Sequence, residues 1–353
     1  MKKIATIVVL LGIVSLANAQ SSRIWSAGPL TWDDFTQKSV LPEETKASDV
    51  SITIAAYEKS VQKDGINIVY NDASAFINPS SWVDKTRMTA AELKKAQDKF
   101  DIAQDFANRL REEMMFAKGD KRDVVKKYQN DCKAALDAYE LDSSYPVPAV
   151  SREEFDITRM SWRKSDVTLG LNLGVTGSFP MGPIADVVNP SVGITLGGEL
   201  FFNRHGVMVD FDFGAGVIKK GNSRGWLAGW DNGMVPNYSV NLMYSYLICN
   251  RDRFHLGVMA GPGYNARLFA EQKGLILDRV EQFTLGGFNV REGVYADWIL
   301  SRNATFNRTP SATDLALRFK LYGDQTFSNV DKMVVPSINI SVALLVRTAR
   351  IFK

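Results

Sequence analysis

The second half of the chain alternates apolar and polar positions with a period of two. In the segment 167–175, valines and leucines occupy one face, and threonine, glycine and asparagine occupy the other. Such alternation predicts half-buried β-strands. The same pattern returns in further segments at 191–202, 207–213, 238–248, 254–261, 288–300, 315–322 and 337–346. We therefore expect eight strands between residues 165 and 353.

An even number of strands with so much aliphatic surface favours a closed barrel in lipid, which satisfies every backbone group and needs an apolar exterior. The alternative is a soluble eight-stranded barrel or sandwich, whose apolar face would point inward. Charged residues lie opposite the aliphatic rows, and they suit a narrow membrane-barrel lumen better than a soluble core. We predict an antiparallel transmembrane barrel whose lumen charge network consists of Glu199, Asp210, Asp212, Arg318 and Lys320.

Link lengths indicate how this barrel is oriented. The links at 203–206 and 250–252 are short, whereas those after the first, third, fifth and seventh strands are longer. Outer-membrane barrels have short turns on the periplasmic side, so the N-terminal domain is expected in the periplasm. The link 301–314 is too long for this rule. Gly286 and Gly287 interrupt the alternation and predict a β-bulge. Aromatic residues expected at the membrane interfaces are Tyr238, Tyr244, Tyr246, Tyr264, Tyr295, Trp298 and Phe352.

The first half of the chain is mixed. Segments 50–57 and 65–70 alternate like two short strands joined by a turn at 63–65. Apolar residues at three-four spacing predict one helix over 93–114 and another over 125–139. Prolines make 143–164 an extended linker. The fold class expected is an α+β domain at 20–142 followed by an all-β barrel at 165–353.

The first residues have the composition of a secretory signal peptide. Lys2 and Lys3 precede an apolar run, and Ala17 and Ala19 supply the small residues before a cleavage site. The formal charge is +3, so removal of 1–19 leaves about +1 (3 − 2), which argues against a nucleic-acid partner. The two cysteines, Cys132 and Cys249, could pair in an exported protein or remain separate buried thiols.

Three short motifs occur in order before residue 116. They are L-x-W-x-D-F at 30–35, S-W-V at 81–83 and F-D-I-A at 100–103. Over 24–115 the chain resembles a family of secreted, predicted zinc-dependent proteases whose helix reads roughly H-E-Q-x-H-F-D-I-A. On that resemblance, the two metal-binding histidines fall on Lys95 and Lys99, and the general-base glutamate falls on Ala96.

An H-E-x-x-H helix works because its histidines hold one zinc ion and its glutamate activates the bound water. Here two ammonium groups replace the ligands and a methyl group replaces the base. The chain's histidines are His205 and His255, both in the barrel half. We therefore expect a degenerate active site, no metal or other cofactor, and no enzymatic activity.

These observations predict an exported protein of the outer membrane with its N-terminal domain in the periplasm. The barrel would contact lipid and anchor the chain, and the protease-like domain would bind another envelope protein, as a subunit of an envelope complex or in a simple pair. The alternative is a small pore or ligand-binding barrel with an accessory periplasmic domain. The sequence leaves the oligomeric state open.

Overall fold

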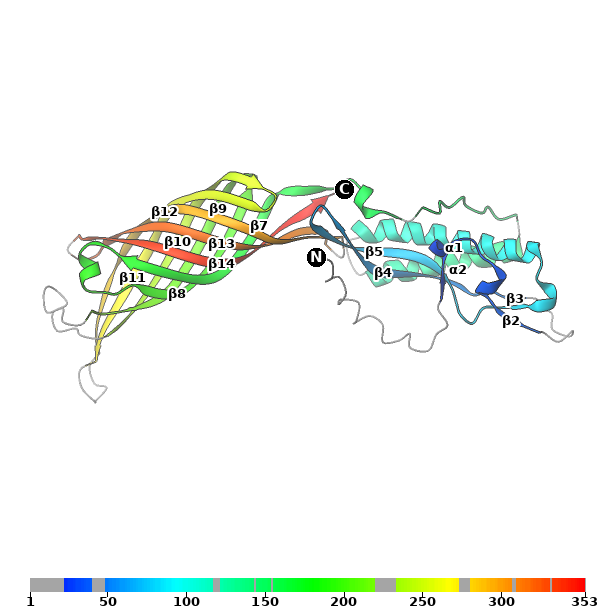
Figure 1. The fold of residues 1–353 in the computed structure, drawn as a ribbon, viewed down its shortest axis with the longest axis horizontal. Coiled ribbons are helices and arrows are strands. Elements are labelled where there is room, and N and C mark those ends of the chain that lie inside the picture. The colour runs from blue at the N-terminus through cyan, green and yellow to red at the C-terminus, as the bar shows by residue number, and fades with distance from the viewer. Residues whose placement is uncertain are drawn as a thin grey trace, which may run out of the picture. The chain divides into compact units, whose positions relative to one another are not determined.

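A computed structural model describes residues 22–39, 48–116, 121–142, 144–153, 155–219, 233–272, 280–306, 309–330 and 332–352. The chain divides into two compact units, which we describe separately (Figure 1). The first unit holds the described residues up to Val61, together with Val69–Met160 and Phe306–Thr309. The second holds Gln62–Ile68, Ser161–Thr305 and Pro310–Lys353. The predicted signal peptide, 1–19, lies outside the described residues.

The second unit is an antiparallel β-barrel, which confirms the eight predicted strands. Each strand pairs with the next along the chain, and the last strand pairs with the first, so that the sheet closes (Figure 1). The strands are β7 (Arg163–Pro180), β8 (Ser191–Phe202), β9 (His205–Val217), β10 (Met234–Arg251), β11 (Phe254–Gln272), β12 (Val280–Thr305), β13 (Ser311–Ser328) and β14 (Val334–Phe352). A short 3₁₀ helix, η5 (Gly182–Asp186), lies between β7 and β8.

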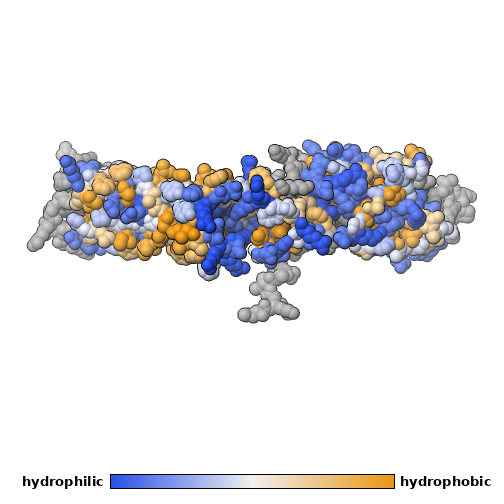
Figure 2. Space-filling model, turned by 90° about the horizontal axis from the view of Figure 1, so that it is seen from above, coloured by the Kyte–Doolittle hydropathy of each residue, from blue (hydrophilic) through white to orange (hydrophobic). Residues whose placement is uncertain are grey.

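The alternation in sequence becomes an alternation between the outside and the inside of the barrel. Along β7, Leu169, Leu171 and Leu173 are 54%, 64% and 60% exposed, whereas the intervening Asn172 is buried. Apolar side chains are therefore spread over the outer surface of the barrel strands (Figure 2). Charged and polar side chains fill the inside together with a buried apolar cluster that includes Phe201, Met208 and Met243.

The predicted bulge at Gly286 and Gly287 is wrong. Both glycines pair in register with β11, and the irregularity in β12 lies instead between Ile299 and Ser301, where its register with β13 shifts. A Cβ on Gly287 would lie 1.9 Å from the carbonyl oxygen of Phe327. The glycine therefore permits close approach of two strands, which interrupts the apolar pattern without inserting a residue.

Two further expectations change at the other end of the barrel. Most of the long link at 301–314 is strand, because β12 continues to Thr305 and β13 begins at Ser311. Tyr295 does not belong to an outer aromatic girdle. It is 1% exposed inside the barrel, where its hydroxyl lies 2.8 Å from that of Ser245. A tyrosine can pack its ring inward wherever its hydroxyl finds such a partner.

The first unit packs two helices on a β-hairpin, whose turn region, Gln62–Ile68, belongs to the second unit. The hairpin joins β4 (Ile52–Lys63) to β5 (Ile66–Ile77), and Asp64 and Gly65 turn the chain with φ of 52° and 76°. The helices are α1 (Ala90–Phe116) and α2 (Lys121–Leu141). The remaining short elements are β1 (Arg23–Ile24), η1 (Trp25–Ala27), η2 (Trp32–Asp34), β2 (Thr36–Lys38), β3 (Ser48–Asp49), β6 (Trp82–Asp84), η3 (Lys85–Arg87) and η4 (Ile157–Arg159).

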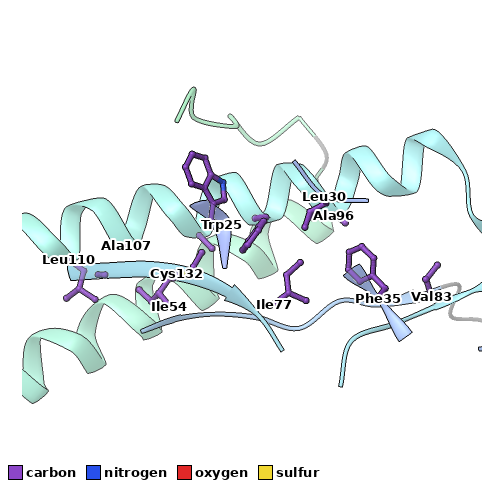
Figure 3. Close-up of a cluster of buried hydrophobic side chains, with 14 of the residues drawn as sticks. Trp25, Leu30, Phe35, Ile54, Ile77, Val83, Ala96, Ala107, Leu110 and Cys132 are labelled. Carbon is purple, nitrogen blue, oxygen red and sulfur yellow. The ribbon is translucent and has the colours of Figure 1, made fainter. Parts of the chain in front are cut away.

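The core of this unit lies between α1 and the hairpin. Phe100, Ala107 and Leu110 on α1 are fully buried, and they pack with Ile54 and Ile77 from the strands (Figure 3). The hydroxyl of Thr89 accepts a hydrogen bond from the backbone N–H of Glu92, one of the free N–H groups in the first turn of α1, at 3.2 Å. None of the described helices combines the length and the apolar character needed to cross a membrane.

Candidate functional site

The two positions at which the similar protease family has its zinc-binding histidines lie where α1 faces α2. Lys95 and Lys99 both bind Glu140 of α2, with each Nζ 2.6 Å from a different carboxylate oxygen. Partial burial opposes ionisation of Glu140, but the two ammonium groups outweigh burial and lower the pKa of this carboxyl. Next to them, Tyr139 donates to Asp98 at 3.1 Å. The two lysines thus hold the helices together with charge.

The other motif residues of α1 hold the N-terminal segment in place. Gln97 accepts a hydrogen bond from the backbone N–H of Leu30 at 2.8 Å and donates one to Asp101 at 2.7 Å. Asp101 also accepts from the indole of Trp25 at 2.7 Å. Ala96, at the position of the catalytic glutamate, is 5% exposed and belongs to the hydrophobic core. In the described part of the chain, no cluster of His, Cys, Asp and Glu could hold a metal ion.

A second polar site fills the barrel near the start of β7. Arg318 forms a two-pronged ion pair with Asp297, at 2.6 and 2.8 Å, and also donates to Glu199. Arg347 bridges the same two acids, at 2.7 Å to Glu199 and 3.0 Å to Asp297. All four side chains are at least nine-tenths buried. Two arginines therefore neutralise two carboxylates inside the barrel.

A second layer of charge follows along the barrel. Lys320 binds both oxygens of Asp210, at 2.8 and 2.7 Å. Arg291 lies 2.8 Å from Asp212 and makes paired bonds of 2.7 and 2.9 Å to Asp324. The guanidinium of Arg291 also stacks on the ring of Tyr322, 4.1 Å from its centroid.

The five lumen residues expected from the sequence are thus divided between two layers. Glu199 and Arg318 meet in one, while Asp210, Asp212 and Lys320 meet in the other. Four further charged members of these layers were not predicted from the sequence, namely Arg291, Asp297, Asp324 and Arg347. Arg291 and Asp297 lie an even number of positions apart in the segment 288–300, so parity along the strand would have placed both inside.

Apolar side chains close the lumen beyond the second layer. This cluster lies at the end of the barrel opposite the turn at 203–204. Ile184 of η5 packs there with residues from the ends of several strands, among them Phe269, which is fully buried. The other buried members are Val187, Val188, Ile218, Val235, Leu285 and Val335. The barrel interior is therefore a packed core of ion pairs with an apolar layer at one end.

The two cysteines do not form a disulfide bond. Cys132 is buried in the core beneath α1, and burial raises the pKa of its thiol to about 11. Cys249 lies on β10 of the barrel and is half-buried.

Comparison with known proteins adds a fold likeness only. No family model matches the chain, and no curated protein matches it. The similar solved structures include Ail, the attachment invasion locus protein of Yersinia pestis, with the heparin analogue sucrose octasulfate (12% identity, TM-score 0.32, covering 53% of this chain and 99% of that one). Neisserial surface protein A is also similar (12% identity, TM-score 0.30, covering 52% of this chain and 97% of that one). So is the outer membrane protease OmpT of Escherichia coli (7% identity, TM-score 0.22, covering 55% of this chain and 99% of that one).

The expectation that the chain is not an enzyme is wrong as a conclusion from the sequence. The expectation rested on Lys95, Ala96 and Lys99, and these residues bear on one zinc-dependent mechanism at one helix. Missing ligands there do not exclude catalysis by other residues of the chain.

The Glu140 ion pairs should stabilise the helix pair in a pH-dependent way. We expect Glu140→Gln to lower the free energy of local opening of α1 at pH 7 by about 0.5–1 kcal/mol. The loss is modest because water screens partly exposed ion pairs. The folded pKa is lowered, so the stabilisation is present above the unfolded value of about 4.3 and is lost as the pH falls through the folded value. Hydrogen exchange of 90–116 in the full chain, at pH 7 and about pH 3, measures this effect. Asp131→Asn on α2 is the control, and an equal loss at both pH values contradicts the ion-pair role.

Removing one arginine from the lumen should be more costly than removing a pair. Arg318→Leu leaves Glu199 and Asp297 buried with one cation between them, and we expect a loss of about 3–5 kcal/mol in the free energy of unfolding. The double variant with Glu199→Gln should lose less than the single variant. Urea unfolding in detergent micelles measures both. Arg251→Leu, at an exposed strand end, should change stability by under about 0.5 kcal/mol, and a similar effect at Arg318 would refute the pairing argument.

Proposed function

We propose that the barrel anchors this chain in an outer membrane and that the N-terminal unit binds another protein of the envelope. The observation that carries the first part is the outward row of aliphatic side chains on a closed barrel with a charged interior. Half or more of the surface of Leu171, Val192 and Leu242 is exposed, at 64%, 73% and 52%. A soluble protein rarely exposes a continuous apolar belt of this kind, whereas a lipid bilayer requires one.

The interior supports anchoring more than conduction. Eight strands enclose a space that side chains just fill. Here both charge layers are paired, and an apolar cluster packs around Phe269 at one end of the lumen. An ion would have to displace these side chains to pass. The alternative function, a small pore, predicts robust channels in planar bilayers containing the full chain, and their appearance would replace the anchor proposal.

A cavity in the N-terminal unit supports protein binding. It has a volume of about 260 Å³ between α1, β5 and the segment that follows α2. Arg152 stacks on Trp25, with 4.9 Å from its guanidinium carbon to the ring centroid, and Arg111 stacks on Phe155 at 4.7 Å. Arginine and aromatic side chains carry much of the binding energy in protein interfaces. Arg152 is 40% exposed at this cavity and could therefore contact a partner.

The membrane-facing role of the outer row can be tested by charge substitution. We expect Leu171→Arg, midway along the outer row of β7, to destabilise the barrel in lipid vesicles by about 2–4 kcal/mol. The matched variant Met234→Arg, at the first residue of β10, should cost about 0–1 kcal/mol because an arginine at a strand end reaches the membrane–water interface. Urea titration of the vesicle-inserted protein measures both. Equal costs at the two positions would argue against a bilayer around the barrel.

Protein binding can be tested by site-specific crosslinking. We expect a photoreactive residue at position 152 to give one discrete adduct in native envelopes, while the same residue at Lys133, exposed on α2, gives none. Mass spectrometry identifies the adduct. Arg152→Ala should then weaken the purified partner's binding by about 1 kcal/mol or more, as expected for an interface arginine. Unchanged binding, with the fold intact, would remove this cavity from the proposed interface.

A further inference from the structure

A second cavity, of about 360 Å³, lies at the end of the barrel where β7 begins and β14 ends. All of its lining residues belong to the barrel unit. His255 and Arg347 line it and connect it to the first charge layer. Lys164, Arg302 and Asp314 line it as well, from the ends of three other strands. The cavity therefore brings together charged groups that are distant in sequence.

Arg347 fixes the proton position on His255. Its Nη1 lies 2.9 Å from Nδ1 of the imidazole. A guanidinium can only donate hydrogen bonds, so Nδ1 must accept, and the ring proton lies on Nε2. Within the described part of the chain, Nε2 makes no hydrogen bond, although only 6% of His255 is exposed. The imidazole thus supplies an unused N–H donor in an otherwise enclosed position.

Arg302 supplies a cation whose charge the neighbouring acids only partly balance. Its Nε is buried without a hydrogen-bond partner, because the nearest acidic oxygen, on Asp314, is 3.8 Å away. That carboxylate already accepts a hydrogen bond from Lys164 at 3.1 Å. The Nη1 of Arg302 contacts Asp252, whose side chain is 99% exposed, so water screens this pair strongly. Two cations therefore share one buried carboxylate, and a buried N–H without an acceptor is unfavourable.

The rest of the lining sets the size and polarity of a ligand. Phe201, Leu247 and Trp162 give the cavity an apolar side. The carboxylate of Asp166, an exposed residue, also lines the cavity and would repel a ligand that carries two negative charges. A group with one negative charge and acceptor oxygens matches the unused N–H of His255 and the cationic side chains of Arg302 and Lys164.

We propose that this cavity binds a small carboxylate with a short apolar body. One carboxylate can accept a hydrogen bond from Nε2 of His255 and lie beside the cations Arg302 and Lys164, while its body lies against the apolar side. The carboxylate could come from a free organic acid or from the C-terminus of a peptide. This site is separate from the proposed membrane anchoring and protein binding, and either could fail without affecting it.

Calorimetric titration of the full chain in detergent micelles tests the proposal. The probes are phenylacetate, its neutral analogue phenylacetamide, and the peptide Gly-Gly-Phe with a free or an amidated C-terminus. We expect each carboxylate to bind at least about tenfold more tightly than its amide, the effect of one charge-assisted hydrogen bond. A tighter peptide assigns the site to protein termini, and tighter phenylacetate assigns it to free acids. Both results support a carboxylate site.

Variants separate the role of the Arg302 guanidinium from general charge. Arg302→Gln should weaken phenylacetate binding about tenfold, and Arg302→Lys should restore only part of it because it keeps the charge without the planar guanidinium donors. Arg251→Gln removes an arginine from the same end of the barrel outside the cavity and should leave binding unchanged. Thermal unfolding checks that each variant is folded. If the Arg302 variants do not fold, the comparison of acid with amide in the native chain still decides.

Three results would overturn the proposal. One is equal affinity for acids and amides, and another is unchanged affinity in folded Arg302→Gln. The third is an absence of binding by any probe up to about 10 mM, which is weaker than useful small-molecule recognition.

Discussion

The pairing of buried charge inside the barrel is the constraint on which the rest of this unit depends. A carboxylate or guanidinium taken out of water is very unfavourable alone, and it becomes tolerable only with a partner held in good geometry. Glu199 on β8 meets Arg318 on β13, and Asp210 on β9 meets Lys320 on β13. These strands are not neighbours in the sheet, so the pairs form across the lumen only when the barrel is closed. The charges must be inside together, and the aliphatic residues between them are thereby turned outward.

Small residues make room for this network. A Cβ on Gly257 would lie 2.3 Å from the ring of Tyr295, and that ring supports the guanidinium of Arg318 at 4.7 Å from its centroid. A Cβ on Gly197 would meet the carboxylate of Asp210 at 2.4 Å. Glycine on the inner face is thus a packing requirement of the large charged side chains opposite.

Like charges also lie close together in the N-terminal unit, where α1 packs on α2. Lys95 and Lys99 would repel each other on one face of α1, and Glu140 of α2 removes that cost by binding both. Gln97 and Asp101 on the same helix secure the segment around Trp25 and Leu30. A motif that resembles a zinc-binding helix therefore has a structural explanation at each of these positions, through contacts with elements that are close only in the folded unit.

Local pattern determined much of the fold of this chain. Period two located eight strands and assigned Asp210, Asp212 and Lys320 to the inside, and three-four spacing located both helices, because strand and helix periodicity are properties of neighbouring residues. The same pattern was ambiguous at Gly286 and Gly287, where close strand approach and a bulge look alike in sequence. Only the tertiary structure decided that Glu140 pairs with residues some forty positions earlier, that Tyr295 packs inward, and that His255 and Arg302 share a cavity. Those outcomes depend on which distant strands and helices become neighbours, and that is fixed by closure of the sheet and packing of the core.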